Sequence, residues 1–271
     1  MPKPLAIDLY AGLGGWSDGL LAEGYEVVGF DIERHEYGDK RYPAQLVLQD
    51  VLTLHGSQFK AAALIVASPP CQEFSYMAMP WSRAKKIESE YKSGALDVKR
   101  LTALFDACFR IQREACEAAG HYIPMVVENV RGAQNWVGRS RWNFGSFHLW
   151  GDVPALMPMA KAFKTSGMNW SNQALRGQDF TRIAGMQAGL KSVQDGLGGY
   201  GGSFGWNNTP MRRGNSKSTG RKAASAMIAK IPLPLSRYIA SVFRPATGCE
   251  YYWPAPGIEG RIVADFDKAR E

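Results

Sequence analysis

The chain has 271 residues, of which 45% are hydrophobic and 21% charged, and a formal net charge of +7 at pH 7. This composition excludes a disordered chain, and the length suits one large α/β domain or one domain with a small insertion. The four cysteines form no C-x-x-C pair, so neither a zinc site nor a disulfide framework is indicated. The excess of Lys and Arg suits a polyanionic partner without identifying one.

Apolar runs alternate with helical patterns along the first half of the chain. Short apolar runs predict strands at 5–9, 26–30, 46–48, 63–67 and 125–127. The run at 5–9 ends in the glycine turn A-G-L-G-G and is followed by a helical pattern, and a second helix is predicted over 101–119. Strands that alternate with helices indicate an α/β fold with a doubly wound, mostly parallel, Rossmann-like sheet.

The second half of the chain has a different texture. Residues 151–210 are rich in Gly, Pro, Met and Asn with weak periodicity, which predicts a loop-rich insertion. Helices are predicted over 218–230 and from 231 to 240, the second packing back on the sheet. Residues 246–271 are expected to form an extended tail. We therefore divide the chain into segments 1–150, 151–217, 218–245 and 246–271. No apolar run long enough to span a membrane occurs, and we expect a cytoplasmic protein.

Polar or reactive residues stand at the ends of the predicted strands. In parallel sheets, ligands bind beyond the carboxyl ends of the strands. The residues in question are Asp8, Asp31, Asp50, Cys71 and Glu128. Five such residues on one edge of a sheet form a candidate site.

The first motif is D-L-Y-A-G-L-G-G, from Asp8 to Gly15. Glycines between a strand and a helix let the backbone approach a ligand closely, and an acid about 20 residues on, here Asp31, can hold ribose hydroxyls. The strict G-x-G-x-x-G pattern fails, because Ser17 stands where the third glycine belongs. The alternative is a tight turn in which Tyr10 is a packing residue.

Two further carboxylates have competing interpretations. Asp50 can accept a hydrogen bond from the exocyclic amine of an adenine while Val51 packs on the ring, or it can cap a helix. Glu128 ends a buried strand, where a raised pKa would let it share a proton with a base edge such as that of cytosine. A salt-bridged residue at the rim is the alternative for Glu128.

Cys71 lies in the segment A-S-P-P-C-Q-E-F-S, directly after an apolar strand. The two prolines fix the backbone and prevent a helix from starting at once, so Cys71 is predicted in a stiff loop, placed there for chemistry or by chance. Arg139 and Arg141 in G-R-S-R can reach a carbonyl oxygen or a phosphate, or form a solvated patch. The basic segment 211–222 suits phosphate contacts, or is a solvated loop.

Together these motifs resemble those of the cytosine-C5 DNA methyltransferases. The family's first motif is D-L-F-A-G-x-G-G, and Tyr10 here replaces its Phe. The nucleophile motif P-C-Q-x-F-S and the motif E-N-V are both present, at 70–75 and 128–130, and Arg139-Ser140-Arg141 is similar to the family's arginine pair. I-A-K-I-P-L-P-L-S-R-Y-I-A resembles the last motif. Only eight residues separate E-N-V from the arginine pair, fewer than is usual, and the chain is most similar to small phage-type members.

The resemblance implies a mechanism. A cytosine is flipped out of duplex DNA, the Cys71 thiolate attacks its C6, Glu128 contacts N3 and the amino group, and Arg141, the partner of Arg139, holds O2. The methyl group comes from S-adenosylmethionine, with no metal. The expected cofactor-binding residues are Asp8, Tyr10, Gly12, Gly14, Gly15, Asp31, Ile32, Asp50, Val51 and Pro70. A mobile loop over 75–86 is expected to close on the DNA.

The expected DNA-binding residues are Gln72, Ser75, Trp81, Arg83, Lys85, Arg212, Arg213 and Lys217. In these terms, segment 1–150 is the catalytic core and segment 151–217 a short target-recognition region. The protein is expected to act as a monomer. The alternatives left open are methylation of RNA such as tRNA, a catalytically decayed DNA-binding relative and, more distantly, nicotinamide oxidoreduction. An amino-methyltransferase is disfavoured, because that chemistry is associated with D-P-P-Y and no thiol.

Overall fold

The computed structural model describes residues 2–70, 74, 81–157, 222, 226–227 and 229–245, with the backbone alone at 81–84. The strands are β1 (Leu5–Leu9), β2 (Glu26–Asp31), β3 (Gln45–Leu48), β4 (Ala62–Ala67), β5 (Met125–Asn129), β6 (Trp142–Phe144) and β7 (Phe147–Gly151). The α-helices are α1 (Gly15–Ala22), α2 (Trp81–Lys92), α3 (Val98–Ala119), α4 (Gln134–Val137) and α8 (Leu233–Val242). Short 3₁₀ turns are η1 (Val51–Thr53), η2 (Gly56–Phe59) and η3 (Arg131–Ala133).

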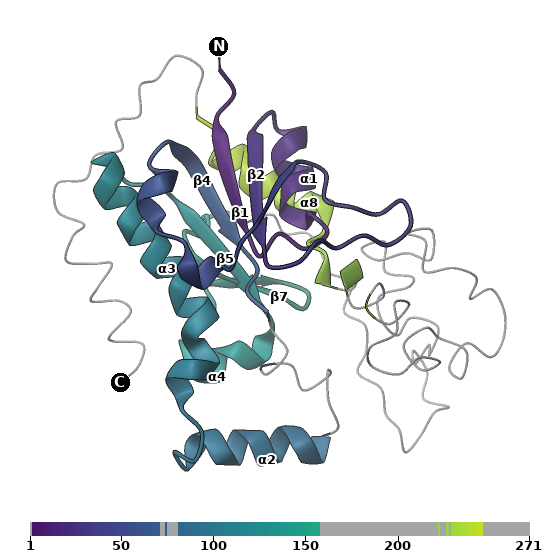
Figure 1. Cartoon of the computed structure of the whole chain (residues 1–271), viewed down its shortest axis with the longest axis vertical. Coiled ribbons are helices and arrows are strands. Elements are labelled where there is room, and N and C mark those ends of the chain that lie inside the picture. The colour runs from purple at the N-terminus through teal and green to yellow at the C-terminus, as the bar shows by residue number, and fades with distance from the viewer. Residues whose placement is uncertain are drawn as a thin grey trace, which may run out of the picture.

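The strands form one sheet in the order β3-β2-β1-β4-β5-β7-β6 (Figure 1). Strands β1 to β5 are parallel, β7 is antiparallel to β5, and β6 is antiparallel to β7. All six residues of the central strand β4 are buried, which is why its sequence A-A-L-I-V-A is a continuous apolar run. The expected α/β fold with a doubly wound, mostly parallel, Rossmann-like sheet is confirmed.

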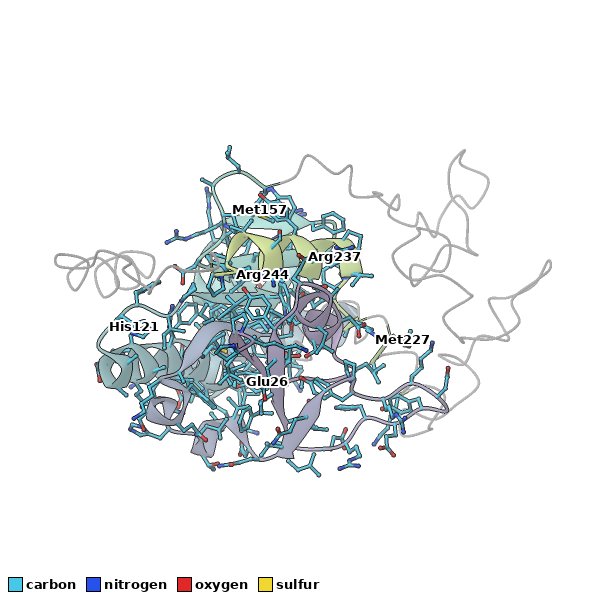
Figure 2. The ribbon with its side chains drawn as sticks, turned by 90° about the horizontal axis from the view of Figure 1, so that it is seen from above. Glu26, His121, Met157, Met227, Arg237 and Arg244 are labelled. Carbon is cyan, nitrogen blue, oxygen red and sulfur yellow. The ribbon has the colours of Figure 1, made fainter. Side chains whose placement is uncertain are left out.

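Helices cover both faces of this sheet, because alternate residues of each strand point to opposite sides. On one face, a core of buried apolar residues such as Ile65, Val127 and Trp150 packs under α3 and the 3₁₀ turns. On the other face, Val66 and Val126 pack under α1 and α8. Figure 2, which looks at the molecule from above, has α8 with Arg237 and Arg244 on one side of the sheet and His121, just after α3, on the other.

Helix α8 packs directly on α1, although some 210 residues separate them in the chain. A Cβ atom added to Gly15 would lie 2.3 Å from the backbone nitrogen of Ile231, so only glycine permits this close approach. The Tyr25 hydroxyl donates to the Ala240 carbonyl over 3.0 Å. The prediction that a helix near 231–240 returns to the sheet is therefore confirmed, while the division of the chain into four segments remains a prediction.

Strands β6 and β7 were not predicted from the sequence. They form an antiparallel hairpin turned at Gly145, which has φ +62°. Strand β6 has only three residues and β7 is buried along almost its whole length, so neither shows the alternation that marks a half-buried strand. The hairpin nevertheless forms one end of the sheet beside β5.

The expected mobile loop over 75–86 is wrong in its second half, because residues 81–86 belong to the helix α2. Ion pairs one turn apart stabilise this helix, with 3.8 Å between Lys86 and Glu90 and 2.7 Å between Lys92 and Glu88. At its end, Tyr91 is buried and its ring packs edge to face on the ring of Trp136 of α4, with 5.6 Å between the ring centroids.

In the described part of the chain, none of the helices combines the length and apolar character of a membrane span.

Candidate functional site at the carboxyl edge of the sheet

The strand register brings several predicted site residues to one edge. Leu9 at the end of β1 lies opposite both Phe30 of β2 and Ala67 of β4, and Ala67 lies opposite Val127 of β5. The chain therefore leaves β1, β2, β4 and β5 at the same level of the sheet. The glycine turn, Asp31, the S-P-P segment and Glu128 follow or end these four neighbouring strands.

The glycine turn after β1 is fixed by the end of β2. The Ala11 amide donates to the Phe30 carbonyl over 3.0 Å, and the Gly12 amide donates to Oδ2 of Asp31 over 2.9 Å. Gly12 has φ +51°, and a Cβ atom added there would meet only the Tyr10 carbonyl oxygen, at 3.9 Å. The backbone at Gly12 thus has open space beside it, as the close approach of a ligand requires.

The carboxyl group of Asp31 is kept ionised by its neighbours. Burial raises its pKa, but hydrogen bonding with His35 and the amides of Gly12 and Glu33 outweighs burial, so the pKa lies below its ordinary value. The same contact raises the pKa of His35, which is 3.7 Å from Asp31 between Nε2 and Oδ2. The next residue, Ile32, is 71% exposed. An anionic hydrogen-bond acceptor therefore lies beside an exposed apolar side chain.

Asp50 caps η1, as in the second of its two interpretations. Its Oδ1 accepts from the Leu52 amide over 2.9 Å, and its side chain is exposed. Val51 is buried in the core under α3. Arg110 of α3 holds the same turn by donating to the Leu52 and Leu54 carbonyls over 3.2 and 2.8 Å. Asp50 is thus available at the surface, whereas the side chain of Val51 is not.

Asp8 lies beneath this edge and does not reach its surface. It is 1% exposed, and its Oδ2 accepts from the Ser17 hydroxyl over 2.5 Å and from the Tyr42 hydroxyl over 3.4 Å. Burial raises the pKa of Asp8 to about 7, although both hydrogen bonds lower it. The carboxyl group joins β1 to α1 and to the chain that leads into β3.

Three more of the expected cofactor-binding residues make contacts within the protein. The Tyr10 hydroxyl donates to the Leu104 carbonyl of α3 over 2.8 Å, which agrees with its interpretation as a packing residue. A Cβ atom on Gly14 would lie 2.3 Å from Cδ of Pro43, and Gly15 is in close contact with Ile231. Gly14 and Gly15 therefore allow protein segments to pack against the turn.

The segment Ser68-Pro69-Pro70, which leads to Cys71, is held from both sides. The Ser68 amide donates to the Leu9 carbonyl over 3.2 Å, and Trp16 of α1 donates from Nε1 to the Ser68 hydroxyl over 3.0 Å. From β5, Nδ2 of Asn129 donates to the Pro69 carbonyl over 3.0 Å. Pro70 is exposed. Cys71 itself lies outside the described residues.

The hairpin β6–β7 connects the arginine pair to the strand that carries Glu128. Glu128 is 8% exposed and lies opposite Leu149 of β7, which in turn lies opposite Trp142 of β6. The Arg141 amide donates to the Leu149 carbonyl over 2.8 Å. Arg139 and Arg141 are both exposed. Glu128 and Trp142, the residue after Arg141, are therefore separated by the single strand β7.

The remaining expected contacts are spread over other parts of the chain. The ones outside the described residues are Gln72, Ser75, Arg212, Arg213 and Lys217. The backbone of Trp81 and Arg83 lies in α2, and so does Lys85, which pairs with Glu88 at 3.5 Å. Over the described ranges, no group of three or more His, Cys, Asp or Glu residues is arranged to hold a metal ion.

Sequence reasoning missed several residues that shape this edge. Asn129 follows Glu128 at the end of a buried strand, a position that already marked Glu128 as a candidate. Ser140 lies between the two arginines, and His148 lies in the run F-H-L-W-G of β7. Trp16 and His148 carried no signal of their own, because their partners, Ser68 and Ser140, are known only from the fold.

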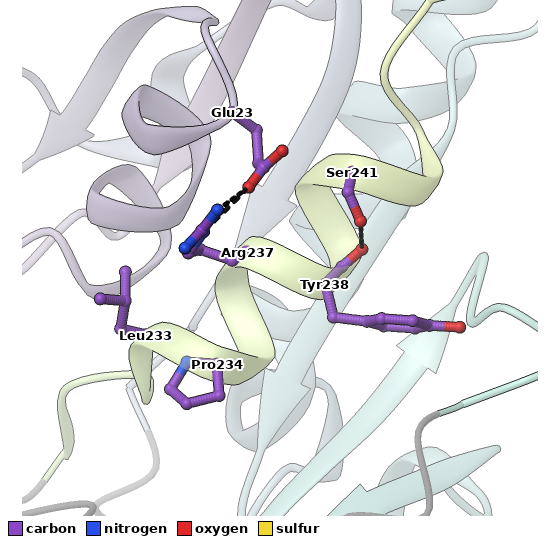
Figure 3. A pocket seen from close by; sticks show the side chains of 6 residues that line it. All are labelled: Glu23, Leu233, Pro234, Arg237, Tyr238 and Ser241. Carbon is purple, nitrogen blue, oxygen red and sulfur yellow. Dashed lines mark hydrogen bonds and ion pairs between the residues drawn. The ribbon is translucent and has the colours of Figure 1, made fainter.

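A surface hollow of about 420 Å³ lies elsewhere, between the end of α1 and α8 (Figure 3). It is lined by Glu23, Leu233, Pro234, Arg237, Tyr238 and Ser241. Arg237 pairs with Glu23 at 2.8 Å, so the charges in this hollow are compensated. None of the expected site residues lines it, which leaves the carboxyl edge as the candidate site.

Comparison with known proteins supports the motifs at this edge. Residues 5–112 match the model of the C-5 cytosine-specific DNA methylase family. This match confirms the resemblance to the DNA methylases, and it includes the glycine turn, Asp31 and the Cys71 segment. No curated protein matches the chain significantly.

Solved structures of methyltransferases are also similar to the chain. One, from E. coli, is assigned as a DNA modification methyltransferase encoded within a prophage. It is 21% identical to this chain, with a TM-score of 0.32. The match covers 48% of this chain and 33% of the E. coli chain. Another is the Entamoeba histolytica methyltransferase EhMeth, which is 14% identical, with a TM-score of 0.33, over 51% of this chain and 41% of its own. The chain thus spans less than half the length of either protein.

Proposed function

We propose that the protein is a DNA (cytosine-5-)-methyltransferase that uses S-adenosylmethionine and forms a covalent bond between Cys71 and C6 of a flipped cytosine. The observation that carries the proposal is the shared edge of β2, β1, β4 and β5. Asp31 and the glycine turn, the segment before Cys71, and Glu128 lie on these neighbouring strands in the order β2, β1, β4 and β5. The match of residues 5–112 to the DNA methylase family supports the same reaction.

The residues on the β1–β3 side of the edge suit S-adenosylmethionine. The open side of Gly12 allows the ligand to approach the backbone, Asp31 offers an ionised acceptor for ribose hydroxyls, and the exposed Ile32 offers apolar contact to the adenine. Asp50 keeps an exposed carboxylate for the exocyclic amine, and Pro70 is exposed at the next strand. When bound, S-adenosylmethionine supplies an electrophilic methyl group. Asp8, Tyr10, Gly14, Gly15 and Val51 support this site from within the protein.

The residues on the β4–β7 side would carry out the covalent chemistry. The Cys71 thiolate forms a bond from its sulfur to C6 of the cytosine, and C5 becomes nucleophilic. Glu128, at N3 and the amino group, stabilises the charge that develops on the ring, and Arg141 together with Arg139 holds O2. Once C5 carries the methyl group, its proton passes to water, the electron pair of that bond restores the double bond between C5 and C6, and the bond from sulfur to C6 breaks to release Cys71 as thiolate.

The partner in this proposal is duplex DNA, bound by a monomer in the cytoplasm. The net charge of +7 favours the phosphate backbone. The proposed phosphate and base contacts are Gln72, Ser75, Trp81, Arg83, Lys85, Arg212, Arg213 and Lys217. Residues 151–217 would choose the target sequence. No metal takes part in the proposed chemistry.

The test is nucleoside mass spectrometry of unmethylated duplex DNA after incubation with the protein and S-adenosylmethionine. We expect 5-methyldeoxycytidine with the native protein and with Cys249→Ala, which removes a different thiol, and none with Cys71→Ala. Product formation by Cys71→Ala would refute the covalent mechanism. If the native protein modifies no DNA but methylates tRNA, the acceptor is RNA, and activity on neither would make the chain a decayed relative.

A further inference from the structure

Ser140, between the two arginines, is the centre of a hydrogen-bond network. Its hydroxyl lies 2.9 Å from Nδ1 of His148 and 3.2 Å from Oε1 of Gln134. Its amide also donates to the Gln134 oxygen, over 3.2 Å. Ser140 is therefore bound through its backbone and its side chain, while the arginines on either side, Arg139 and Arg141, are exposed.

One arrangement of protons satisfies every group in this network. With the proton of His148 on Nδ1, the imidazole donates to Ser140 Oγ, and Ser140 in turn donates to Gln134 Oε1. Burial lowers the pKa of His148, and the positive charge of Arg131 lowers it further, so the ring is neutral near pH 7. A neutral ring adds no further positive charge beside the arginine pair.

The network connects the arginine segment to β7, the strand next to the one that carries Glu128. His148 lies on β7 directly opposite Asn129, and it is 8% exposed. Two further bonds hold the segment at its ends. Trp150 donates from Nε1 to the Gly138 carbonyl over 3.0 Å, and the Arg141 amide donates to the Leu149 carbonyl over 2.8 Å.

The consequence is a short segment whose backbone is held along its length. Gly138, Ser140 and Arg141 each bond to β7 or α4, and the side chains of Arg139 and Arg141 remain at the surface. An arginine fork recognises a planar acceptor only when it is aligned, and a held backbone reduces the entropy lost on alignment. Free loop residues of this length would present the forks in many directions.

We propose that Gln134, Ser140 and His148 are positioning residues that fix the arginine segment on β7, the neighbour of the strand that carries Glu128, and thereby align the arginine pair on the target base. The inference rests on the proposed function. These three residues touch neither the substrate nor the cofactor in this proposal, and they act through Arg139 and Arg141.

The main test compares Ser140→Ala with Ser140→Thr, which keeps the hydroxyl, and with Asn143→Ala. Asn143 is a matched control, since it lies on the same hairpin, opposite His148, and its side chain bonds only the Gly145 carbonyl in the contacts described, over 3.1 Å. We expect Ser140→Ala to lower the turnover number roughly five- to tenfold, because the change removes both hydrogen bonds of the Ser140 hydroxyl. Ser140→Thr and Asn143→Ala should stay within about twofold of the native protein.

Two further measurements separate positioning from general support of the fold. His148→Asn, which can keep a donor near the position of Nδ1, should retain more activity than His148→Phe. Adding Ser140→Ala to Arg139→Ala/Arg141→Ala should cause no further loss in single-turnover methylation, because there is no arginine left to align. Affinity for S-adenosylmethionine, measured by calorimetry, should be the same in all these variants.

The inference is wrong if Ser140→Ala turns over like the native protein, if Asn143→Ala is equally impaired, or if the loss persists in full without the arginines. It is also wrong if cofactor affinity falls as much as turnover, because the network would then support the fold in general. In all these cases the native protein is active, and the proposed function stands. A native protein that methylates no nucleic acid would instead refute the proposed function.

Discussion

The two ends of the carboxyl edge are built in different ways. At the β1–β2 end, the end of β2 holds backbone amides of the glycine turn, with the Gly12 amide bound to Asp31, 19 residues on. At the β5–β7 end, Glu128 and the arginine pair are joined through a hairpin and side-chain contacts, and Asn129 reaches Pro69, 60 residues away. The first end is therefore held through the backbone amides of one sequence motif, whereas the second depends on the register of a hairpin and on side-chain contacts.

This difference separates two tasks in the proposed enzyme. Changes at the β1–β2 end should alter cofactor affinity, and changes at the β5–β7 end should alter the chemical step. The following predictions test whether the two ends are as independent as their construction suggests.

The largest effect is expected for Glu128→Gln. Loss of a positioned acid in the chemical step should lower the turnover number on the order of 10²- to 10⁴-fold, with cofactor affinity unchanged. The rate of DNA methylation at saturating substrate gives the turnover number, and calorimetry gives the affinity for S-adenosylmethionine. Glu117→Gln, an exposed glutamate on α3, is the control and should behave like the native protein. A large loss of cofactor affinity in Glu128→Gln would show that the two ends are coupled.

The reverse pattern is expected for Asp31→Ala. The change removes a charged hydrogen-bond acceptor from Gly12 and from the cofactor, so affinity for S-adenosylmethionine should fall by about 10- to 100-fold, or about 1.5–3 kcal/mol. Turnover at saturating cofactor should change much less. Asp39→Ala, an exposed acid in the segment that follows, is the control. Native affinity in Asp31→Ala would mean that this end of the edge does not bind the cofactor.

Asp8 should make stability depend on pH at the β1–β2 end. Its folded pKa of about 7 lies above its ordinary value of 3.8, so between these values the unfolded chain has lost a proton that the folded chain keeps. The contribution of Asp8 to the free energy of unfolding should therefore fall as pH rises through this window, by at most about 1.4 kcal/mol per pH unit. Urea unfolding from pH 4 to pH 8 measures the slope.

The comparison variant is Asp8→Asn, which has no proton to lose. Its free energy of unfolding should decline less steeply with pH than that of the native protein across the same window. Equal slopes in the two proteins would mean that Asp8 is ionised in the fold at neutral pH.

The smallest effect is expected where the two ends meet, at Trp16→Phe. This change removes the indole N–H that Ser68 accepts and keeps most of the apolar volume, so the turnover number should fall about fivefold, or about 1 kcal/mol. A double-mutant cycle with Ser68→Ala measures the pair, and its coupling should account for most of the loss. Additive effects of the two changes would contradict a role for this hydrogen bond.

The sequence predicted the parallel half of the fold well, because its signals are local. Each of β1 to β5 is an apolar run bounded by polar or glycine residues, and Gly12 and Asp31 belong to one motif. For Asp50, the sequence allowed either a contact with adenine or a helix cap. The structure shows the cap on η1, which is a common role for an Asp that precedes a helical turn. For these residues, neighbours in the chain determine most of the structure.

The antiparallel half could not be predicted in the same way. Three residues of β6 carry no periodicity, and the roles of Ser140 and His148 depend on a register that only the folded hairpin creates. Asp8 shows a different limit: its position near the end of a strand predicted a ligand contact, and only the fold shows that Ser17 and Tyr42 enclose its carboxyl group. Whether a carboxylate at the end of a strand is exposed depends on the other segments that pack on it, and the motif alone does not show this.

The packing of α8 on α1 also affects how the protein is made. Tyr25 and its hydrogen-bond partner Ala240 are 215 positions apart, so during translation the early residues emerge long before the helix that covers them. At about 5–20 residues per second, that interval is roughly 10 to 40 seconds. Through this time the face of α1 that holds Gly15 and Gly19, against which Ile231 and Ser236 later pack, is uncovered on the nascent chain.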